Sequence, residues 1–486
     1  MLTHRPEKTV PNPMKFTILS HAGLLVEHAG VRVVCDPWLL GSCYWRSWWN
    51  FPEPDPELTA DLRADFVYLT HLHWDHFHGP SLRRLFSPKT RVLVPKVPTR
   101  RMVEDLHYLG FEDVVEIPHG SSCVLAPDFT LRSYQFGLGV DSAAVLSGGG
   151  TTLFNCNDAK LFGLPLKQVL RDFPRIDFLL RSHSSAGPIP YCVENYERLP
   201  HEMLVQSDSA DQFVRCALHV GARYAIPFAS NHCFLHRETI GFNGTATTPE
   251  EVAAHYRQVA ASVSSRTECV VMPPGSSWSD REGFRNQPFD FSARAQYIES
   301  MLSRHGAKLA ACYAAEDRVS ADFGSFLTYF ERMMAAVPRL IRRRALSPIV
   351  FEVRDAAGRR FWRIDPAVPA VAELPAPLAG DVVFAVHAAV LRDCTRNRMF
   401  SVWSASKRLQ IKLPAPQALA AATRWLTVLD LYELDTFPLA RNLSPRSLAI
   451  RLRRWREPVE LASLLLRRTL LRRPTTIASL YPLKAA

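Results

Sequence analysis

Short runs of apolar residues recur from residue 15 to about 278 and alternate with turns and amphipathic windows. The stretch KFTILSHAGLLVEHAGVRVVCDPWL, residues 15–39, predicts three strands joined by turns. Later windows such as TRRMVEDLHYLG, residues 99–110, place apolar residues three and four apart and predict helices between strands. Strands that first form a meander and then alternate with helices favour a layered α/β sandwich over one doubly wound sheet.

The pattern changes after residue 280. Residues 292–346 predict mainly helices, whereas 347–366 and 380–413 each predict strands joined by a turn. The Pro/Ala-rich stretch 365–380 predicts a loop. We therefore expect a leader at 1–13, an α/β domain at 14–290, a smaller α+β C-terminal domain at 291–413 and a basic helical tail at 414–486.

Composition narrows the class of protein. The 486 residues are 47% hydrophobic and 22% charged, which is ordinary for a globular protein. The sequence has no apolar run near the roughly 18 residues that span a bilayer, and residues 1–20 lack the apolar core of a secretory signal. The ten cysteines are scattered without a Cys-x-x-Cys pair, which argues against a disulfide framework and a zinc knuckle. These features predict a cytoplasmic protein.

The formal net charge is +11, and the excess is densest at 339–345 and 445–474. In the second segment arginines alternate with leucines at roughly helical spacing, as in a basic amphipathic helix on a membrane surface. The alternative is a helix that packs its leucines on the protein and leaves its arginines in water. Basic patches with interleaved aromatics are not evident, so we expect no nucleic-acid partner. The expected partners are a small-molecule or lipid-linked, anionic substrate and, through the tail, the membrane surface.

The stretch THLHWDHFHG, residues 70–79, follows a predicted strand and places four histidines and one aspartate in ten positions. Imidazole and carboxylate ligands together suit zinc or iron. His71 and His73 alternate on an extended segment and can point to one side, while Asp75 and His76 can reach a second position. A centre of two ions about 3.5–4 Å apart needs this density of ligands. The motif predicts a metal centre rather than a solvated loop or a set of core histidines.

The HxHxDH pattern resembles the signature of the metallo-β-lactamase fold, and the resemblance extends over roughly residues 15–280. It implies an αβ/βα sandwich with one or two metal ions where strand ends converge. The resemblance implies that His71, His73 and one further histidine hold the first ion. It assigns the remaining ligands as follows: Asp75 and His76 on the second ion, Asp158 in TTLFNCNDAKL as the bridging aspartate, and His236 in IPFASNHCFLHRET as the last histidine.

Within this fold, three weaker motifs resemble the catalytic part of the CMP-N-acetylneuraminate hydroxylase family and its bacterial relatives. They are FLLRSHSSAGPIPYC at 178–192, the sequence NCNDA, and PFAS followed by His236.

One segment departs from the family pattern. The family has a histidine just before the hairpin that leads to the aspartate, whereas RSYQFGLGVDSAAV, residues 132–145, contains none. His119, His183 and His232 are the candidates for the additional ligand or for a substrate contact. The alternative for His119 is a turn residue, and the alternative for His183 is simple capping. Without a replacement, the first ion loses a ligand.

Several residues near the motif are candidates for orienting the ligands or for lining a pocket. Asp36, at a strand end, resembles the aspartate that accepts an imidazole N–H and fixes the ligand tautomer, the alternative being a turn before Pro37. His21 could face the site or the core, and His78 is expected at a pocket rim or on the surface. The tryptophans of SCYWRSWWNFP, residues 42–52, either line a pocket mouth or pack over the sheet.

Three functions are compatible with these residues. The first is a metal-dependent hydrolase in which two divalent ions, with zinc preferred over iron, activate water against an ester, lactone, amide or phosphodiester, while Asp75 or Asp158 accepts a proton. The second, from the hydroxylase resemblance, is a non-haem diiron oxygenase. The Rieske cluster of that family needs Cys-x-His and Cys-x-x-His, which this sequence lacks, so the electrons would come from an external reductase. The third is a degenerate module that only binds a ligand.

Overall fold

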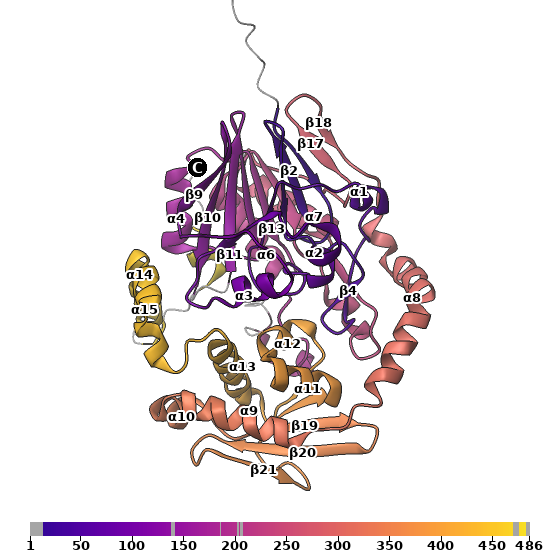
Figure 1. Ribbon diagram of the computed structural model, residues 1–486, viewed down its shortest axis with the longest axis vertical. Coiled ribbons are helices and arrows are strands. Elements are labelled where there is room, and N and C mark those ends of the chain that lie inside the picture. The colour runs from indigo at the N-terminus through magenta and orange to yellow at the C-terminus, as the bar shows by residue number, and fades with distance from the viewer. Residues whose placement is uncertain are drawn as a thin grey trace, which may run out of the picture.

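Two β-sheets packed face to face form the N-terminal part of the molecule (Figure 1). The computed structural model describes residues 13–137, 141–184, 186–201, 204, 208–469 and 476–482. The expected leader at 1–13 therefore lies, except for its last residue, outside the described residues.

The first sheet has eight strands and carries the metal-binding motif at one of its strand ends. In spatial order the strands are β18 (Gly283–Arg285), β17 (Ser277–Ser279), β1 (Lys15–Ile18), β2 (Leu24–His28), β3 (Val31–Cys35), β6 (Phe66–Tyr68), β7 (Arg91–Pro95) and β8 (Val114–Ile117). The strands from β3 to β8 run parallel, and short apolar runs such as RVLVP suit their burial on both faces.

The second sheet has seven strands and supplies the opposite wall. In spatial order they are β16 (Glu268–Cys269), β14 (Tyr224–Phe228), β13 (Phe178–Ser182), β12 (Thr151–Asn157), β11 (Asp141–Gly148), β10 (Phe129–Phe136) and β9 (Ser121–Ala126). Strands β9 to β12 form an antiparallel meander, and β12, β13, β14 and β16 are parallel. A small third sheet joins β15 (His232–Phe234), β5 (Trp48–Asn50) and β4 (Ser42–Cys43).

Helices cover the outer face of each large sheet, as the alternation of strands and amphipathic windows predicts. On the first sheet α2 (Gly79–Leu85) and α3 (Arg101–Tyr108) bury Leu82 and Leu106 against the strands. On the second, α4 (Gly163–Asp172), α6 (Ser209–Val220) and α7 (Pro249–Ser262) do the same with residues such as Leu166 and Phe213. A short helix, α1 (Pro56–Ala60), connects β5 to β6. The αβ/βα sandwich implied by the resemblance is therefore confirmed.

The second region is a five-stranded sheet covered by helices, and its core is separate from that of the sandwich. Its strands are β21 (Ala370–Leu374), β20 (Gly358–Asp365), β19 (Ile349–Asp355), β22 (Val382–His387) and β23 (Gln410–Lys412). Its helices are α9 (Phe323–Ala336), α10 (Arg339–Ala345), α11 (Ala388–Asn397), α12 (Phe400–Ser406) and α13 (Leu419–Glu433). Since α13 buries Trp425 in this core, the region continues past residue 413.

Two sequence expectations for this region are wrong. Residues 380–413 do not form strands joined by a turn, because α11 and α12 lie between β22 and β23. Val390, Leu391 and Cys394 have the spacing of one helical face and are buried in the core. A helix buries all three together, so tertiary packing favours the helix over a strand. The predicted loop at 365–380 contains β21, which pairs with β20 at the edge of the sheet.

Two segments connect the sandwich with the second region. The long helix α8 (Arg294–Glu316) runs from one to the other along the flank of the molecule (Figure 1). The tail helices α14 (Pro445–Arg453) and α15 (Arg456–Thr469) return to the sandwich beside α4, and α16 (Ile477–Leu480) packs on α6. Among the helices that the structure describes, none has both the length and the apolar composition that crossing a bilayer would require.

Candidate metal centre

The motif loop is fastened to the neighbouring strand end by Asp36. Strands β3 and β6 are adjacent and parallel, so the residues after them meet at one edge of the sheet. The carboxylate of Asp36 accepts a hydrogen bond from the backbone N–H of Thr70 at 2.8 Å and another from the Thr70 hydroxyl at 2.7 Å. These bonds fix the start of the segment that carries the HxHxDH residues.

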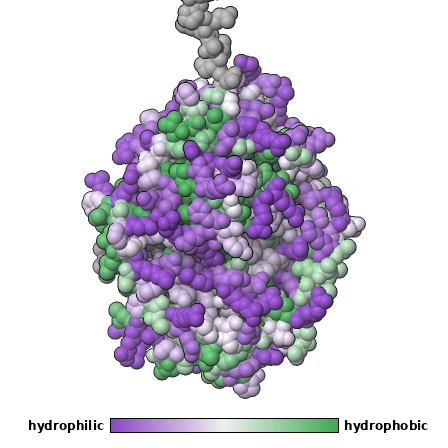
Figure 2. Space-filling view, in the orientation of Figure 1, coloured by the Kyte–Doolittle hydropathy of each residue, from purple (hydrophilic) through white to green (hydrophobic). Residues whose placement is uncertain are grey.

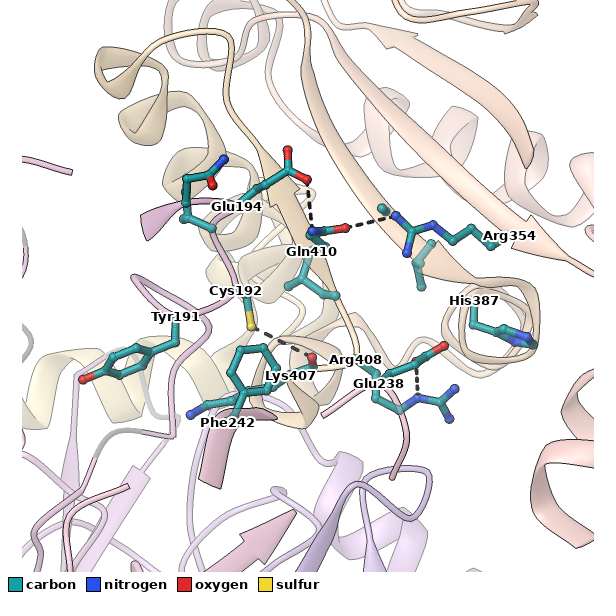
Figure 3. Close-up of a pocket in the computed structure, with 15 residues that line it drawn as sticks. Tyr191, Cys192, Glu194, Glu238, Phe242, Arg354, His387, Lys407, Arg408 and Gln410 are labelled. Carbon is teal, nitrogen blue, oxygen red and sulfur yellow. Dashed lines mark hydrogen bonds and ion pairs between the residues drawn. The ribbon is translucent and has the colours of Figure 1, made fainter. Parts of the chain in front are cut away.

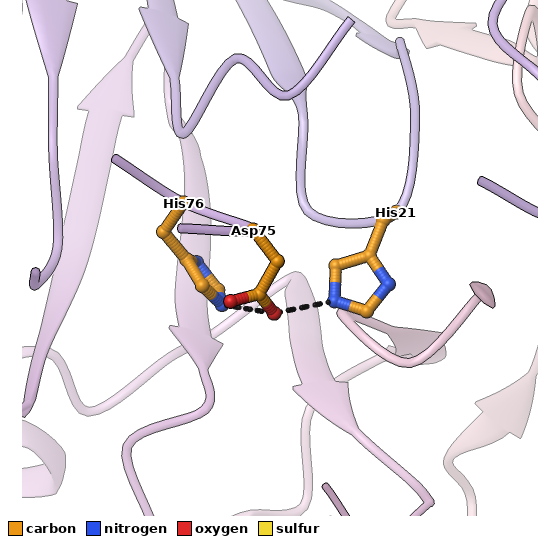
Figure 4. Close-up of side chains that lie close together, drawn as sticks. All are labelled: His21, Asp75 and His76. Carbon is orange, nitrogen blue, oxygen red and sulfur yellow. Dashed lines mark hydrogen bonds and ion pairs between the residues drawn. The ribbon is translucent and has the colours of Figure 1, made fainter. Parts of the chain in front are cut away.

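Histidine and aspartate side chains gather beyond this loop in three overlapping groups. Within each group the potential ligand atoms lie within 4.8 Å of one another. The groups are His21, Asp75 and His76 (Figure 4); His71, His76 and Asp158; and His71, His73 and Asp141. Because His71 and His76 each belong to two groups, the seven side chains form one continuous centre rather than three separate sites. The donor set fits one or two divalent transition-metal ions.

Asp141 lies beside His71 and His73, in the segment where the family pattern has a histidine and this sequence has none. It is the first residue of β11, and its Oδ1 lies 3.9 Å from Nε2 of His71. The same His71 nitrogen is 2.8 Å from Nδ1 of His73. Two imidazoles and one carboxylate therefore converge at this end of the centre, so an acidic side chain is available where the family pattern has a histidine.

The other end of the centre is built around His76. Its Nε2 lies 3.2 Å from Oδ2 of Asp158 and 3.3 Å from Oδ2 of Asp75. Asp158 follows the end of β12 and so comes from the opposite sheet. The structure thus brings Asp158 to the motif, as the resemblance implies, across the interface of the two sheets.

Burial and charge set the protonation of these groups before any ion binds. Burial lowers the pKa of both His71 and His73 to about 4, and each has a neighbouring imidazole that adds to the effect. Burial alone would raise the pKa of Asp158, but the hydrogen bond from His76 and its charge lower it to about 2. At neutral pH these residues therefore present neutral imidazoles and a carboxylate, the forms that coordinate cations.

His76 has the opposite shift. Its burial favours the neutral ring, but the charges of Asp75 and Asp36 outweigh this effect and raise its pKa well above the ordinary value. An arriving ion must therefore displace a proton from Nε2 of His76.

Asp36 orients two of the imidazoles. It accepts a hydrogen bond from Nδ1–H of His76 at 3.0 Å, which leaves Nε2 directed at the centre. The hydroxyl of Thr70, itself bonded to Asp36, lies 3.0 Å from Nδ1 of His71 and directs that ring in the same way. Asp36 is fully buried, and the side-chain amide of Asn157 also donates to it.

Replacing Asp36 with asparagine is expected to weaken metal binding about 10- to 100-fold, because such orienting partners typically contribute this much. The amide would present N–H groups where His76 and Thr70 already donate. Metal affinity measured by competition with a chelator checks this, with Asp61→Asn, which changes an exposed carboxylate at the end of α1, as control. Unchanged affinity in Asp36→Asn would contradict the orienting role.

Asp75 is held from both sides by residues outside the motif. Tyr44 donates a hydrogen bond to its Oδ1 at 2.5 Å, and Nε2 of His21 lies 3.0 Å from its Oδ2. The charges and hydrogen bonds of His76 and His21 outweigh burial and hold the pKa of Asp75 well below its usual value. Asp75 is therefore an ionised carboxylate with one oxygen shared between His21 and His76 (Figure 4).

His236 does not join the centre, contrary to the expectation for the last histidine. Its Nε2 pairs with Oε2 of Glu316 at 3.3 Å, and its Nδ1 accepts the backbone N–H of Glu238 at 3.2 Å. Glu316 ends α8, so the fold uses His236 in a buried contact between the sandwich and the helix that leads to the second region.

The three candidates for the missing ligand also lie outside the metal-binding groups. His119 accepts the backbone N–H of Gln135 and bonds to the side chain of Gln168. His183 and His232 are buried, and neither ring nitrogen of either residue makes a hydrogen bond within the described part of the chain. The ring of His232 stacks on Trp48 with 3.6 Å between ring centroids.

The remaining aromatic and histidine residues shape the surroundings. His78 caps the start of α2 by accepting the N–H of Ser81, and it also lines a cavity of about 910 Å³. Trp45 and Trp74 line the same cavity, which lies between the motif loop and the second region. Trp48 and Trp49 are buried. The tryptophan-rich loop thus serves both purposes considered for it, packing and lining a cavity.

A second cavity, of about 400 Å³, lies where the two regions meet (Figure 3). Burial lowers the pKa of Lys407 in its wall to about 8, and the ammonium lies 5.0 Å from the ring centroid of Phe234 and 5.5 Å from that of Phe242. Arg408 beside it is 1% exposed and pairs with Glu316 at 2.5 Å and Glu238 at 2.7 Å. Together with His236, these ion pairs fasten the second region to the sandwich.

Breaking this ion network is expected to destabilise the fold. Arg408→Met should lower the free energy of unfolding by about 3–5 kcal/mol, because Glu316 would be left buried without its partner. Chemical denaturation measures the change, and adding Glu316→Gln should recover part of it. A loss below about 1 kcal/mol, as for a surface pair, would contradict a fastening role.

Comparison with known proteins agrees with this description. Residues 15–163 match the family described as "Beta-lactamase superfamily domain". A "Putative Rieske 2Fe-2S iron-sulfur protein" of Mycolicibacterium smegmatis is 31% identical over 254 residues, which are 49% of this chain and 48% of that protein. Cytidine monophosphate-N-acetylneuraminic acid hydroxylase of Mus musculus is 30% identical over 119 residues, 24% of this chain and 21% of that protein. The chain spans about half the length of the first relative.

Among solved structures, the metallo hydrolase Igni18 of Ignicoccus hospitalis matches with a TM-score of 0.38 and 17% identity, covering 57% of this chain and all of that one. Residues 15–163 belong to a domain of the metallo-β-lactamase superfamily, the chain is distantly related to the hydroxylase, and both resemblances drawn from the motifs are confirmed.

Three residues in or beside the centre are not predicted as site residues by the sequence. Asp141 lies in the segment where a histidine is expected, so a carboxylate at this position could have been recognised as a candidate ligand. His21 sits in the turn after β1 and could equally have been a core residue. For Tyr44 no local signal exists, because its contact with Asp75 depends on the path of the loop between β4 and β5.

Proposed function

We propose that this metallo-β-lactamase superfamily domain is an iron-dependent oxygenase with a dinuclear centre, which oxidises a small organic substrate with electrons from a separate reductase. The observation that carries the proposal is the group His71, His73 and Asp141. Two histidines and one carboxylate with open positions are typical of non-haem Fe(II) oxygenases. Zinc hydrolases also use two histidines and one carboxylate, so the metal content has to decide between the two classes.

The relatives support the same class of reaction. One is named as a hydroxylase, and the mycobacterial relative is named as a Rieske iron-sulfur protein. Rieske clusters carry single electrons. An oxygenase that takes its electrons from a partner of this kind is consistent with both names.

The residues divide into holding and orienting roles. His71, His73 and Asp141 would hold one ion, and His76, Asp158 and Asp75 the other, with His21 directed at Asp75. When bound, iron would supply the oxygen activation and electron transfer that amino-acid side chains lack. Asp36 and Thr70 keep Nε2 of His71 and His76 pointed inward. Asp158 and Asp141, with 20% and 26% of their side chains exposed, are the carboxylates of the centre that water and substrate can reach, and Asp158 is the candidate proton acceptor.

Metal binding is expected to depend on the ionisation of Asp141. Burial, and then the charge of Asp158, raise the pKa of Asp141 to about 6. Its carboxylate is the form that binds a cation, so affinity for the ion near His71 and His73 should fall by about tenfold per pH unit below 6. Affinity for the ion near His76 should fall with pH over the whole range, because that ion competes with the proton on His76. His71 and His73 remain neutral down to a pH of about 4 and should add nothing to this step.

Metal retention measured after dialysis between pH 7.5 and 5 checks this dependence. The step near pH 6 should be absent in Asp141→Asn. A profile for Asp141→Asn that still shows the step would assign it to another group.

The experiment that tests the proposal begins with the metal. Protein from cells supplied with both iron and zinc is expected to contain two iron ions per chain and a visible absorption band. With a chemical reductant it should consume oxygen, and chelation should abolish the consumption. Two zinc ions without oxygen consumption would overturn the proposal, and a protein that binds neither metal would favour the degenerate binding module.

Hydrolysis is the second candidate, favoured by the group His71, His76 and Asp158. Asp158 stays ionised and is accessible to solvent, so it could take a proton from a metal-bound water. Zinc-loaded protein assayed on chromogenic esters, lactones and phosphodiesters tests it. Turnover that disappears in Asp158→Asn, with metal content retained, would support a hydrolase.

A further inference from the structure

The tail helices expose an unusual number of large apolar side chains. Of the thirteen that are exposed in the described part of the chain, six fall between residues 439 and 459: Leu439, Leu443, Leu448, Leu452, Trp455 and Val459. The last four are between 42% and 71% exposed. Leu448 and Leu452 are four residues apart on α14, the spacing of one helical face, Trp455 lies in the turn between the two helices, and Val459 is in the first turn of α15. We call these four residues the outer stripe.

Two arginines, Arg446 on α14 and Arg454 in the turn that follows it, contact the sandwich. Arg446 pairs with Glu116 and also donates to the carbonyl of Val97 at 2.7 Å. Arg454 is 9% exposed, and its guanidinium donates to the carbonyl of Gly137 at 2.9 Å. At these positions arginines face the sandwich while Leu448 and Leu452 face water, which differs from the interpretation of the sequence in which leucines pack inward and arginines lie in water.

Positive charge borders the outer stripe. Arg453 and Arg456 are exposed, and in the part of the chain that the structure describes neither forms an ion pair with a carboxylate. Arg456 lies over the ring of Trp455, 5.5 Å from its centroid. The nearby acids face inward, since Glu457 pairs with Arg454 and Glu460 accepts the backbone N–H of Leu164 at 2.8 Å.

The stripe lies on an open side of the molecule. Figure 1 shows α14 and α15 in yellow at the outer edge of the sandwich, and Figure 2 shows hydrophobic and hydrophilic residues side by side along that edge. An apolar face of this kind on a helix end that also carries basic residues is typical of surfaces that meet a partner.

We propose that the outer stripe binds the surface of an anionic lipid bilayer. Its leucines, Val459 and Trp455 would enter the boundary between headgroups and acyl chains, where tryptophan is favoured. Arg453 and Arg456 would meet the lipid phosphates. A second copy of the chain fits less well, because a two-fold contact through the stripe would bring these arginines toward their own equivalents without an exposed acid between them.

Co-sedimentation of the full-length protein with vesicles tests the proposal. One set contains phosphatidylcholine alone, and the other contains phosphatidylcholine with about one-third phosphatidylserine. We expect binding to the second set that is at least tenfold tighter than to the first and that weakens as salt is raised. Leu452→Glu combined with Trp455→Ser should lower binding at least tenfold, and Arg453→Gln with Arg456→Gln should remove the preference for phosphatidylserine.

Controls separate a surface effect from misfolding. Val368→Glu changes an equally exposed apolar residue of the second region and should bind like the parent protein. Far-UV circular dichroism and thermal melting should match for all variants, because the altered residues are exposed. The proposal is overturned if the parent protein binds neither set or binds both equally. It is also overturned if the stripe variant abolishes a concentration-dependent dimer instead of lipid binding, since the stripe would then contact a second copy.

Discussion

Replacing His71 with alanine is expected to remove the ion that His71, His73 and Asp141 would hold and to weaken binding of the second ion. His71 belongs to two of the three groups, one with His73 and Asp141 and one with His76 and Asp158. Only Nε2 of His71 points inward, so His71 would be a direct ligand of the first ion, and its loss would also disturb His76, whose ring centroid lies 4.2 Å away. Because loss of an orienting partner alone typically costs 10- to 100-fold in affinity, loss of a direct ligand should lower affinity for the first ion more than about 100-fold. Oxygen consumption should disappear with the metal.

Comparison with His73 makes this prediction specific. His73 belongs to one group only, so His73→Ala should lose one ion and retain the other. Elemental analysis after dialysis measures both variants, and His255→Ala, a partly exposed histidine of α7, serves as control. Retention of two ions by either variant would contradict the assignment of His71 and His73 to the first ion.

Changing Asp141 is expected to alter which metal is bound. Asp141→Asn removes a negative charge and a strong oxygen ligand, so the ion near His71 and His73 should be lost while the ion near His76 remains. Asp141→His would restore a third imidazole, and the site should then prefer zinc over iron. The predicted effect is thus a change in stoichiometry for one variant and a change in identity for the other.

Iron and zinc content of the Asp141 variants, purified from the same medium, checks this prediction. Asp61→Asn, which changes an exposed carboxylate, controls for charge. Asp141→Asn that keeps two iron ions would show that the carboxylate lies near the ion without binding it.

Local sequence patterns account for most of the sandwich. Apolar strands such as β6 and β7 and amphipathic helices such as α3 carry their own signals, because burial on one or both faces fixes the spacing of apolar residues. The clustering of His71, His73, Asp75 and His76 is likewise local, since a metal ion is the usual reason for a chain to place four such side chains within six residues. Asp158 required the family resemblance, because only the packing of two sheets brings it to His76.

The failures have tertiary causes. His236 has a neighbourhood that matches the family, but buried Arg408 and Glu316 come from residues that are distant in the chain, and the sequence does not reveal that His236 bonds to Glu316. Asp141 became a candidate ligand only when the hairpin of β10 and β11 placed it beside His71. The orientation of the tail has a tertiary cause too. Its alternating arginines and leucines do not show which side faces the protein, and that side is marked by the pair between Arg446 and Glu116, which is distant in the chain.

The most direct test of the account is anomalous diffraction from crystals of the protein loaded with iron. We predict two peaks about 3.5–4 Å apart, one in contact with His71, His73 and Asp141 and the other in contact with His76, Asp158 and Asp75. A single peak, or an ion bound by His236 instead of Asp141, would contradict the arrangement on which the proposed oxygenase rests.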